Sequence, residues 1–214
     1  MTYAMPSLMR VPLAEKGLTI ADFLVPVRVA ERVSPLARHG GLVAAGIALL
    51  ILTSRIAIPI PGDPVPFVLT NFGVLVVGGS LGLRRGAFAA VGYVALGALG
   101  MPVFAEGRTG LTVLLGATGG YLLGFIAAAA LVGRLAELGW DRRLGGAVAA
   151  TLLGSALIYA IGVPWLAVVA RMPLGEAVRQ GFMPFVMADV VKLLAAAVVF
   201  PVAWWVVGRR PSDR

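Results

Sequence analysis

The sequence predicts an all-α integral membrane protein, a bundle of six membrane-spanning helices with both termini in the cytoplasm. Three observations predict it: the composition, the number of long apolar runs, and the placement of basic residues. Of the 214 residues, 59% are hydrophobic and 13% are charged, whereas a soluble domain carries about 25% charged residues. This composition excludes a large water-soluble core and favours a multi-pass protein of the cell (inner) membrane.

Six apolar runs approach the length of a membrane span. The hydrocarbon core of a bilayer is about 30 Å thick and needs about 20 helical residues to cross it. Several of the runs are short and rich in glycine, which lets helix backbones approach closely. We therefore expect a compact membrane domain over residues 40–210. The runs cover residues 41–58, 67–83, 86–102, 117–138, 145–169 and 184–208.

The connection between the second and third runs is very short, Leu83-Arg84-Arg85-Gly86. So few residues can join two helices only as an antiparallel hairpin. The sequence therefore predicts that residues 67–83 and 86–102 pack side by side.

Residues 1–39 differ from the rest of the chain, because they are polar, mixed in charge and broken by prolines. This pattern predicts a cytoplasmic N-terminal tail. We expect no cleaved secretory signal, because the first apolar run begins far from the N-terminus and continues without an evident cleavage site.

Basic residues mark the predicted cytoplasmic ends of the runs. Thirteen of the 18 lysines and arginines fall in the tail, in the connections at residues 84–85 and 134–143, and at the C-terminus, whereas four fall on the opposite side. By the positive-inside bias, both termini are cytoplasmic. We therefore attribute the net charge of +8 to basic residues that set the orientation of the chain in the membrane, and we expect no nucleic-acid partner.

An acid and a base, Asp189 and Lys192, lie three residues apart inside the last run. Burying either charge in hydrocarbon costs about 3 kcal/mol on insertion scales. On a helix the two side chains share a face, so they can form a structural ion pair or together hold a polar, charged ligand. Asp189 lies about five residues, or roughly 7 Å, below the external start of its helix.

The chemically distinctive segments fall on the external side of this topology. They are residues 59–66, 100–108, 117–121 and 181–184, the last of which leads into Asp189. The cytoplasmic connections contain little besides arginine. We therefore infer a pocket that opens outward in the outer leaflet and is capped by external loops.

Residue types needed for catalysis or metal binding are scarce. The chain has no cysteine and one histidine, His39, which lies before the first run. An intramembrane enzyme needs a nucleophile with its base, or paired acidic metal ligands, and the spans offer one deeply placed acid, Asp189. The Gly-x-x-x-x-Gly-Lys-Ser/Thr phosphate loop is also missing. We expect no enzymatic activity, metal or cofactor, and any ATP hydrolysis is assigned to separate subunits.

Four external motifs occur in order along residues 41–208: Ile58-Pro-Ile-Pro61 with Pro64-Val-Pro66, Gly97-Ala-Leu-Gly-Met-Pro-Val-Phe-Ala105, Gly116-Ala-Thr-Gly-Gly-Tyr-Leu-Leu-Gly-Phe125, and Pro184-Phe185 with Asp189 and Lys192. Together they resemble the BioY family, the biotin-binding S components of energy-coupling factor (ECF) transporters. The resemblance implies a six-helix membrane protein that captures biotin from outside. Its implied partners are a transmembrane coupling subunit and two ATPase subunits, besides membrane lipid.

The resemblance also implies which side chains contact the ligand. Biotin offers a ureido head, an apolar ring and tail, and a carboxylate, so its site needs an amide or carboxylate, apolar walls and a cation. Asp189 and Asn71 suit the head, and Arg108 or Lys192 suits the carboxylate. The implied walls are aromatic: Phe72, Phe104, Tyr121, Trp165 and Phe185.

One motif departs from the family pattern. Where the family often reads Thr-Leu-Gln-Thr-Phe-Gly, this chain reads Val68-Leu-Thr70-Asn71-Phe72-Gly73. The usual glutamine position is Thr70 and the amide moves to Asn71, so either of the two contacts the ligand. Structural roles stay open as alternatives: an ion pair with Glu106 for Arg108, an interfacial position for Tyr121 or Trp165, and helix packing for Asn71.

Small residues recur four apart in the first run, as at Ala44 and Ala48. They indicate either close packing within the chain or, as the resemblance implies, a face that docks the coupling subunit. Two functional alternatives also remain. One is an S component for another vitamin, such as thiamine or riboflavin, and the other is a solitary biotin transporter that works without ATPase partners.

Overall fold

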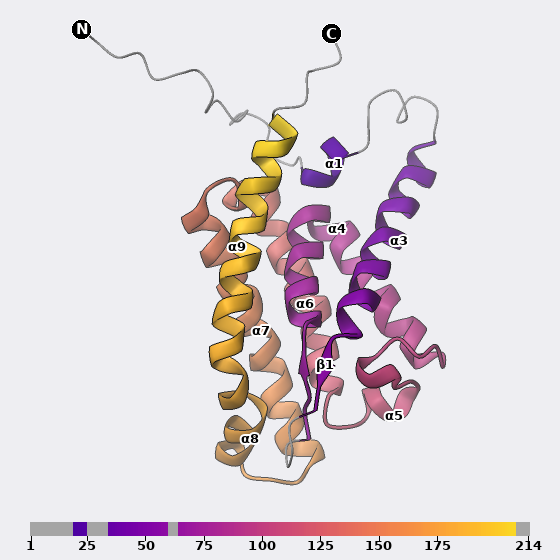
Figure 1. Cartoon of the computed structure of the whole chain (residues 1–214). Helices are drawn as coiled ribbons and strands as arrows, with labels where there is room; N and C mark the ends of the chain where they lie inside the picture. The colour runs from indigo at the N-terminus through magenta and orange to yellow at the C-terminus, as the bar shows by residue number, and fades with distance from the viewer. Residues whose placement is uncertain (1–18, 25–33, 60–63, 209–214) are drawn as a thin grey trace, which may run out of the picture.

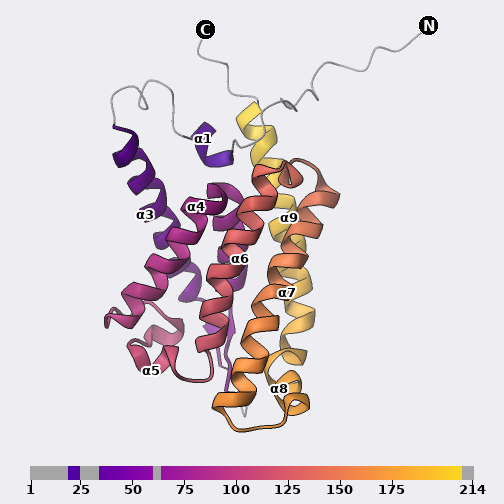
Figure 2. The same cartoon turned by 180° about the vertical axis from the view of Figure 1, so that it is seen from behind.

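The computed structural model of the protein describes residues 19–24, 34–59 and 64–208 (Figures 1 and 2), and the side chains of a few residues of the last helix, Lys192 among them, lie outside that description. Apart from one pair of two-residue strands, the regular structure in these ranges is helical, which confirms the all-α prediction. The elements are α1 (Ile20–Leu24), α3 (Pro35–Ser54), β1 (Ala57–Ile58), β2 (Phe67–Val68), α4 (Thr70–Ala98), η2 (Ala105–Gly107), α5 (Leu111–Leu114), α6 (Gly119–Glu137), η3 (Trp140–Arg142), α7 (Leu144–Val169), α8 (Leu174–Gly181), η4 (Met183–Phe185) and α9 (Val186–Gly208).

Five helices of the described ranges are long and apolar enough to cross a membrane: α3, α4, α6, α7 and the part of α9 from Asp189 to Val206. Large apolar side chains such as Phe88 and Leu152 are exposed on their outer faces, as expected where lipid replaces water. These helices confirm a multi-pass membrane protein. The first span starts earlier than predicted, at Pro35, because Ser34 caps the helix by accepting a hydrogen bond from the backbone N–H of Ala37.

Helix α4 folds back on itself at Gly82. This residue has φ 84° and ψ 178°, a conformation that glycine adopts without a steric penalty. In a straight helix Thr70 and Tyr93 would be about 35 Å apart, yet the Tyr93 hydroxyl lies within hydrogen-bonding reach of Thr70. A Cβ on Gly86 would lie 3.0 Å from the Cα of Gly78. The predicted hairpin is therefore present, and its reversal lies at Gly82, just before the predicted connection.

Helix α6 occupies the centre of the bundle, between α4 and α7 (Figure 2). Glycines permit both contacts: a Cβ on Gly78 of α4 would lie 2.6 Å from the carbonyl oxygen of Ala129, and one on Gly124 would lie 2.9 Å from the Cα of Ile158. Side chains this small let backbones approach where lipid offers no hydrophobic drive for association. Helix α9 packs against α7 and α4, with the Phe200 ring over Gly79.

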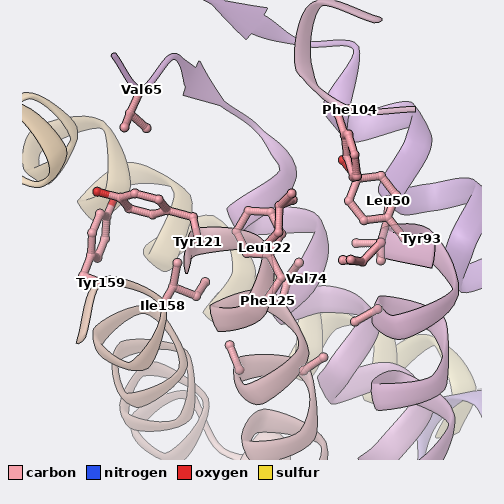
Figure 3. Packing of buried hydrophobic residues seen from close by; sticks show 14 of the residues in the cluster. Leu50, Val65, Val74, Tyr93, Phe104, Tyr121, Leu122, Phe125, Ile158 and Tyr159 are labelled. Atoms are coloured by element: carbon pink, nitrogen blue, oxygen red, sulfur yellow. The ribbon is translucent and has the colours of Figure 1, made fainter. Parts of the chain in front are cut away.

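The main hydrophobic cluster runs from α3 through α4 and α6 to α7 (Figure 3). Aromatic side chains dominate one end of it. The rings of Tyr93 and Phe104 meet edge to face with centroids 5.7 Å apart, and those of Tyr121 and Tyr159 meet in the same way at 6.2 Å. Such pairs are stabilising beyond the area they bury, so the ring contacts add to the stability of this end.

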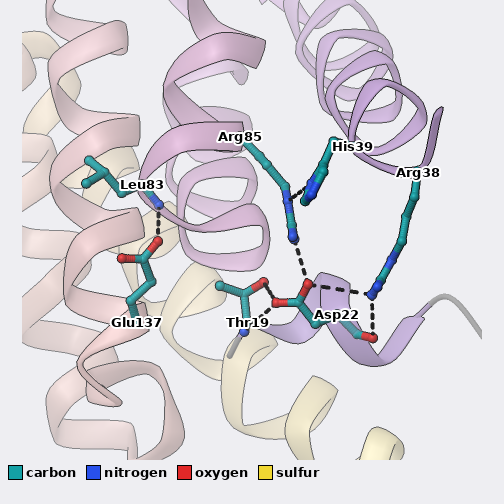
Figure 4. Close-up of polar contacts among 7 residues, drawn as sticks. All are labelled: Thr19, Asp22, Arg38, His39, Leu83, Arg85 and Glu137. Atoms are coloured by element: carbon teal, nitrogen blue, oxygen red, sulfur yellow. Dashed lines mark hydrogen bonds and ion pairs between the residues drawn. The ribbon is translucent and has the colours of Figure 1, made fainter. Parts of the chain in front are cut away.

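Helix α1 closes the opposite end of the bundle, at the reversal of α4 (Figures 1 and 4). Both the backbone N–H and the hydroxyl of Thr19 donate to the Asp22 carboxylate at 3.0 Å, and Arg85 donates to its other oxygen at 2.8 Å. Burial alone would raise the pKa of Asp22, but these hydrogen bonds and the charge of Arg85 outweigh it and lower that pKa. Glu137 accepts a hydrogen bond from the backbone N–H of Leu83 at 2.9 Å. Part of the predicted tail is therefore packed against the membrane domain.

Candidate functional site

A cavity lies among residues of β2, the loop around η2, α6 and α7. Figure 1 shows β1 at the end of the bundle remote from α1, and Figure 3 shows several of the side chains that line the cavity, among them Tyr121 and Tyr159. About 610 Å³ of empty space lies among its lining residues, the open mouth included. The parts of the chain that line it are the β2 segment with the start of α4, the second arm of α4, the loop around η2, α5, the start of α6, α7 and η4. The lining residues are Val65, Pro66, Val68, Thr70, Asn71, Tyr93, Phe104, Ala105, Arg108, Val113, Thr118, Tyr121, Leu122, Phe125, Tyr159 and Phe185.

The end of α3 holds the loop after α4 beside this cavity. The Ser54 hydroxyl donates to the carbonyl of Val103 at 2.6 Å, and Arg55 donates to the carbonyl of Pro102 at 2.6 Å. The β1–β2 pair then brings the chain back, with Ala57 opposite Val68. These contacts bring the first turn of α4 and the loop that follows the end of α4 to the same cavity.

A chain of polar side chains forms one wall. The hydroxyl of Tyr159 donates to the Asp189 carboxylate, and the Asn71 side chain lies within hydrogen-bonding reach of the same hydroxyl. Asn71 and Tyr159 line the cavity directly. Asp189 is 5% exposed and lines a groove between α7, α8 and α9 instead. Asp189, the predicted acid, therefore does not line the cavity itself but holds the hydroxyl of Tyr159, which does.

Aromatic side chains form the adjoining wall. The Tyr121 hydroxyl donates to the carbonyl of Gly181 at 2.8 Å, so its ring is held between α6 and α8. A Cβ on Gly162 would lie 2.5 Å from that ring, which is why a residue without a side chain faces it. Phe182 packs edge to face on Tyr159 at 4.9 Å. The apolar part of a ligand would meet rigid rings here.

Arg108 approaches the cavity from the loop after α4. The turn at η2 is tight, with Glu106 at φ 59° and Gly107 at φ 73°, and the backbone N–H of Phe104 donates to the carbonyl of Arg108 at 3.1 Å. The guanidinium pairs with Glu106 at 3.1 Å, and both side chains are about two-fifths exposed, 43% and 37%. An ion pair this exposed contributes less than about 1 kcal/mol, so a ligand carboxylate could replace Glu106 at little cost.

The structure thus brings six of the ten predicted contacts to one cavity and places three, Asp189, Phe72 and Trp165, elsewhere. Those that line it are Thr70, Asn71, Phe104, Arg108, Tyr121 and Phe185. Lys192 lies in α9, three residues after Asp189, and its side chain is outside the described part of the structure.

Two predicted aromatic walls, Phe72 and Trp165, are among the three that lie elsewhere. Phe72 packs beside Leu75 and Val132. Trp165 donates from its indole N–H to the carbonyl of Gly116 at 2.9 Å, which fixes the loop before α6. Within the described lining neither residue contributes, so both have structural roles in this conformation.

Several lining residues were not predicted, and Tyr159 is the most consequential of them. It lies in the middle of α7, where a phenol in an otherwise apolar run was the only available signal. The sequence does not indicate that Tyr93, Leu122 and Phe125 line a cavity, because residues of these types in an apolar run are ordinarily packing or interfacial residues. Their place at the cavity depends on the reversal of α4 and on the central position of α6.

These features define a class of protein. A multi-pass helical protein whose cavity is lined by an amide, phenols and a guanidinium is built to bind a small polar solute within the membrane. In the described ranges no group of three or more His, Cys, Asp and Glu side chains could hold a metal ion.

Comparison with known proteins gives the family. The BioY family model matches residues 27–209, and the chain belongs to that family. Helix α1 lies outside the matched residues. The chain is 41% identical over 160 residues to "Biotin transporter BioY" of Thermotoga maritima, covering 74% of this chain and 92% of that relative. It is 33% identical over 160 residues to "Biotin transporter BioY2" of Lactococcus lactis, covering 73% and 85%.

A solved structure shows the same fold. The chain is similar to a crystal structure at 2.1 Å of the S-component for biotin from an ECF-type ABC transporter, with a TM-score of 0.71 and 26% sequence identity. The match covers 78% of this chain and 90% of that chain.

Proposed function

We propose that the chain is a biotin-binding S component of an ECF-type transporter, and that it captures biotin in the cavity lined by Asn71, Tyr159 and Arg108. The family and the named relatives support the ligand. The observation that carries the proposal is the pairing of a polar wall, Asn71 with Tyr159, and a cation, Arg108, at one hollow.

The residue chemistry fits the parts of biotin. The ureido group both donates and accepts hydrogen bonds. The Asn71 amide can do both as well, and the Tyr159 oxygen, which donates its proton to Asp189, can accept a hydrogen bond. Arg108 suits the carboxylate, because a guanidinium forms paired hydrogen bonds with it. Asp189 fixes the Tyr159 hydroxyl from behind, and Lys192 is a second candidate cation.

We further propose a topology of six crossings with both termini in the cytoplasm of a cell whose inner membrane holds the protein. The two arms of α4 count as separate crossings. The first arm, residues 70–81, would be roughly 18 Å long at 1.5 Å per residue, shorter than a full bilayer core, so β2 and the external loops complete that side. The cavity then opens outward.

Transport requires partners in this proposal, namely a transmembrane coupling subunit and two ATPase subunits. Ala44 and Ala48 are exposed on α3, while Gly46 faces inward toward Val77 and Ala89. The exposed small residues are therefore available for close packing against another helix. If the chain transported biotin without partner subunits, the face of α3 that carries Ala44 and Ala48 would contact lipid instead.

Calorimetric titration of the purified chain with biotin tests the proposal. Saturable binding at or below micromolar biotin is expected, with no displacement by thiamine or riboflavin. Absence of binding at micromolar biotin, or displacement by another vitamin, would remove biotin as the ligand. Uptake of labelled biotin with and without the coupling and ATPase subunits distinguishes the S component from a solitary transporter.

A further inference from the structure

The residues that line the cavity proposed for biotin differ sharply in exposure. Among the described residues of that lining, Arg108 is the only exposed one. Tyr93, Phe104 and Tyr159 are all buried. In the described part of the structure the cavity therefore opens beside Arg108. A ligand whose head lies beside Tyr159 then has its other end at this mouth.

A carboxylate stands beside Arg108 at the mouth. One oxygen of Glu106 lies 3.1 Å from a guanidinium nitrogen of Arg108. Glu106 has φ 59°, a left-handed conformation that is uncommon for a residue other than glycine. Two backbone hydrogen bonds close the turn around it, from Gly107 to the carbonyl of Phe104 at 3.0 Å and from Arg108 to the carbonyl of Ala105 at 3.1 Å. The loop thus holds the acid and the base next to each other.

The ion pair keeps hydrogen-bonding capacity for a ligand. A guanidinium has several N–H donors and a carboxylate has several acceptor positions, and the contact at 3.1 Å joins one nitrogen of Arg108 to one oxygen of Glu106. Both side chains are exposed. A group at the mouth can therefore reach a donor and an acceptor side by side without separating the pair.

A free carboxylate suits only one half of this pair. It can accept hydrogen bonds from Arg108, but its negative charge is repelled by that of Glu106. An amide suits both halves, because its carbonyl oxygen accepts from Arg108 and its N–H donates to Glu106. The amide is also neutral, so the ion pair stays intact.

We propose that the cavity binds biotin joined through its carboxyl group to an amine, as in biotinyl-lysine, as well as free biotin; this inference rests on the proposed function. The amide lies at the mouth between Arg108 and Glu106, and the amino acid extends out of the cavity. Hydrolysis of proteins that carry biotin on a lysine side chain would supply such a ligand. Glu106 is then the residue that discriminates between the amide and the free acid.

Calorimetric titration of the full chain with free biotin and with biotinyl-lysine tests the proposal. Biotinyl-lysine is expected to bind within about fivefold of free biotin, because an exposed contact between charged groups is worth at most about that factor. A larger loss would show that the carboxylate end of biotin is enclosed by the protein, and it would overturn the proposal.

The variant Glu106→Gln tests the role of the acid. It should bind biotinyl-lysine about threefold more weakly than the parent chain and should not weaken the binding of free biotin. The matched control is Glu176→Gln, which changes an acid that pairs with Arg179 in α8 and is not among the lining residues. The control should leave the ratio of the two dissociation constants unchanged. An unchanged ratio in Glu106→Gln, or an equal change in the control, would overturn the proposal.

A pair of ligands gives the same test without any variant. Biotin N-methylamide and biotin methyl ester differ in the N–H that would donate to Glu106. The parent chain should bind the amide about threefold more tightly than the ester, and equal affinities would contradict the inference. If free biotin itself does not bind, the proposed function fails. If free biotin binds and the amides do not, only this inference fails.

Discussion

Removing one hydroxyl, by Tyr159→Phe, should weaken biotin binding more than any other change of a single oxygen atom in the cavity. The hydroxyl donates to the Asp189 carboxylate and lies within reach of Asn71. The bond that biotin would add at this oxygen is one from a neutral ureido N–H, which contributes about 0.5–1.5 kcal/mol, and each 1.4 kcal/mol is a factor of about ten in affinity. The expected loss of biotin affinity is therefore about 2- to 12-fold.

The assay is calorimetric titration in detergent, with Tyr121→Phe as the matched control. That variant also removes a buried hydroxyl and keeps its ring, but its hydroxyl donates to the carbonyl of Gly181 in α8. It should lower the free energy of unfolding by about 1 kcal/mol and change biotin affinity little.

Two results would refute this reasoning about Tyr159. One is a Tyr159→Phe protein that binds biotin within twofold of the parent chain. The other is additivity in the double variant Tyr159→Phe with Asp189→Asn, because two side chains that act through one hydrogen bond should show a coupling energy.

Four further predictions follow from the described contacts. Arg108→Gln should weaken biotin binding about tenfold, and Glu106→Gln should not weaken it; equal losses in titration would make Arg108 a structural residue. Gly82→Ala should lower the unfolding temperature, because its φ of 84° and the neighbouring Glu137 atoms at 2.8 Å leave no room for a Cβ, and an unchanged temperature would show that the reversal lies elsewhere. Burial raises the pKa of Asp141 to about 6, an effect partly offset by the Trp204 hydrogen bond, so folding favours its neutral form. The stability it contributes is present below about pH 4 and is lost as pH rises to about 6, and Asp141→Asn should flatten the unfolding temperature between pH 4 and pH 6. Ala48→Trp should leave biotin titration unchanged and abolish uptake with the partner subunits, and normal uptake would exclude this face as the docking surface.

Sequence patterns predicted the helical membrane class well, because apolar runs and basic connections report the bilayer directly. They also predicted the hairpin, since two residues between apolar runs leave no other path. The exact reversal at Gly82 was not predictable from composition. It depends on a φ that several nearby glycines could adopt equally well.

The site was predicted where polar residues stand out against an apolar background. Asn71 and Arg108 are of this kind, and the structure places both at the cavity. Tyr159 was missed because its importance comes from contacts with Asp189 and Asn71, which lie in other helices. Phe72 and Trp165 show the converse, since an aromatic side chain near the end of a helix can face a cavity, a neighbouring helix or a loop, and only packing decides among them.

A structure determined with biotin bound tests the central claim most directly. The account predicts ligand density in the cavity proposed for biotin, with the ureido group beside Asn71 and Tyr159 and the carboxylate toward Arg108. Density in the groove between α7 and α9, or a ureido group remote from Tyr159, would contradict it.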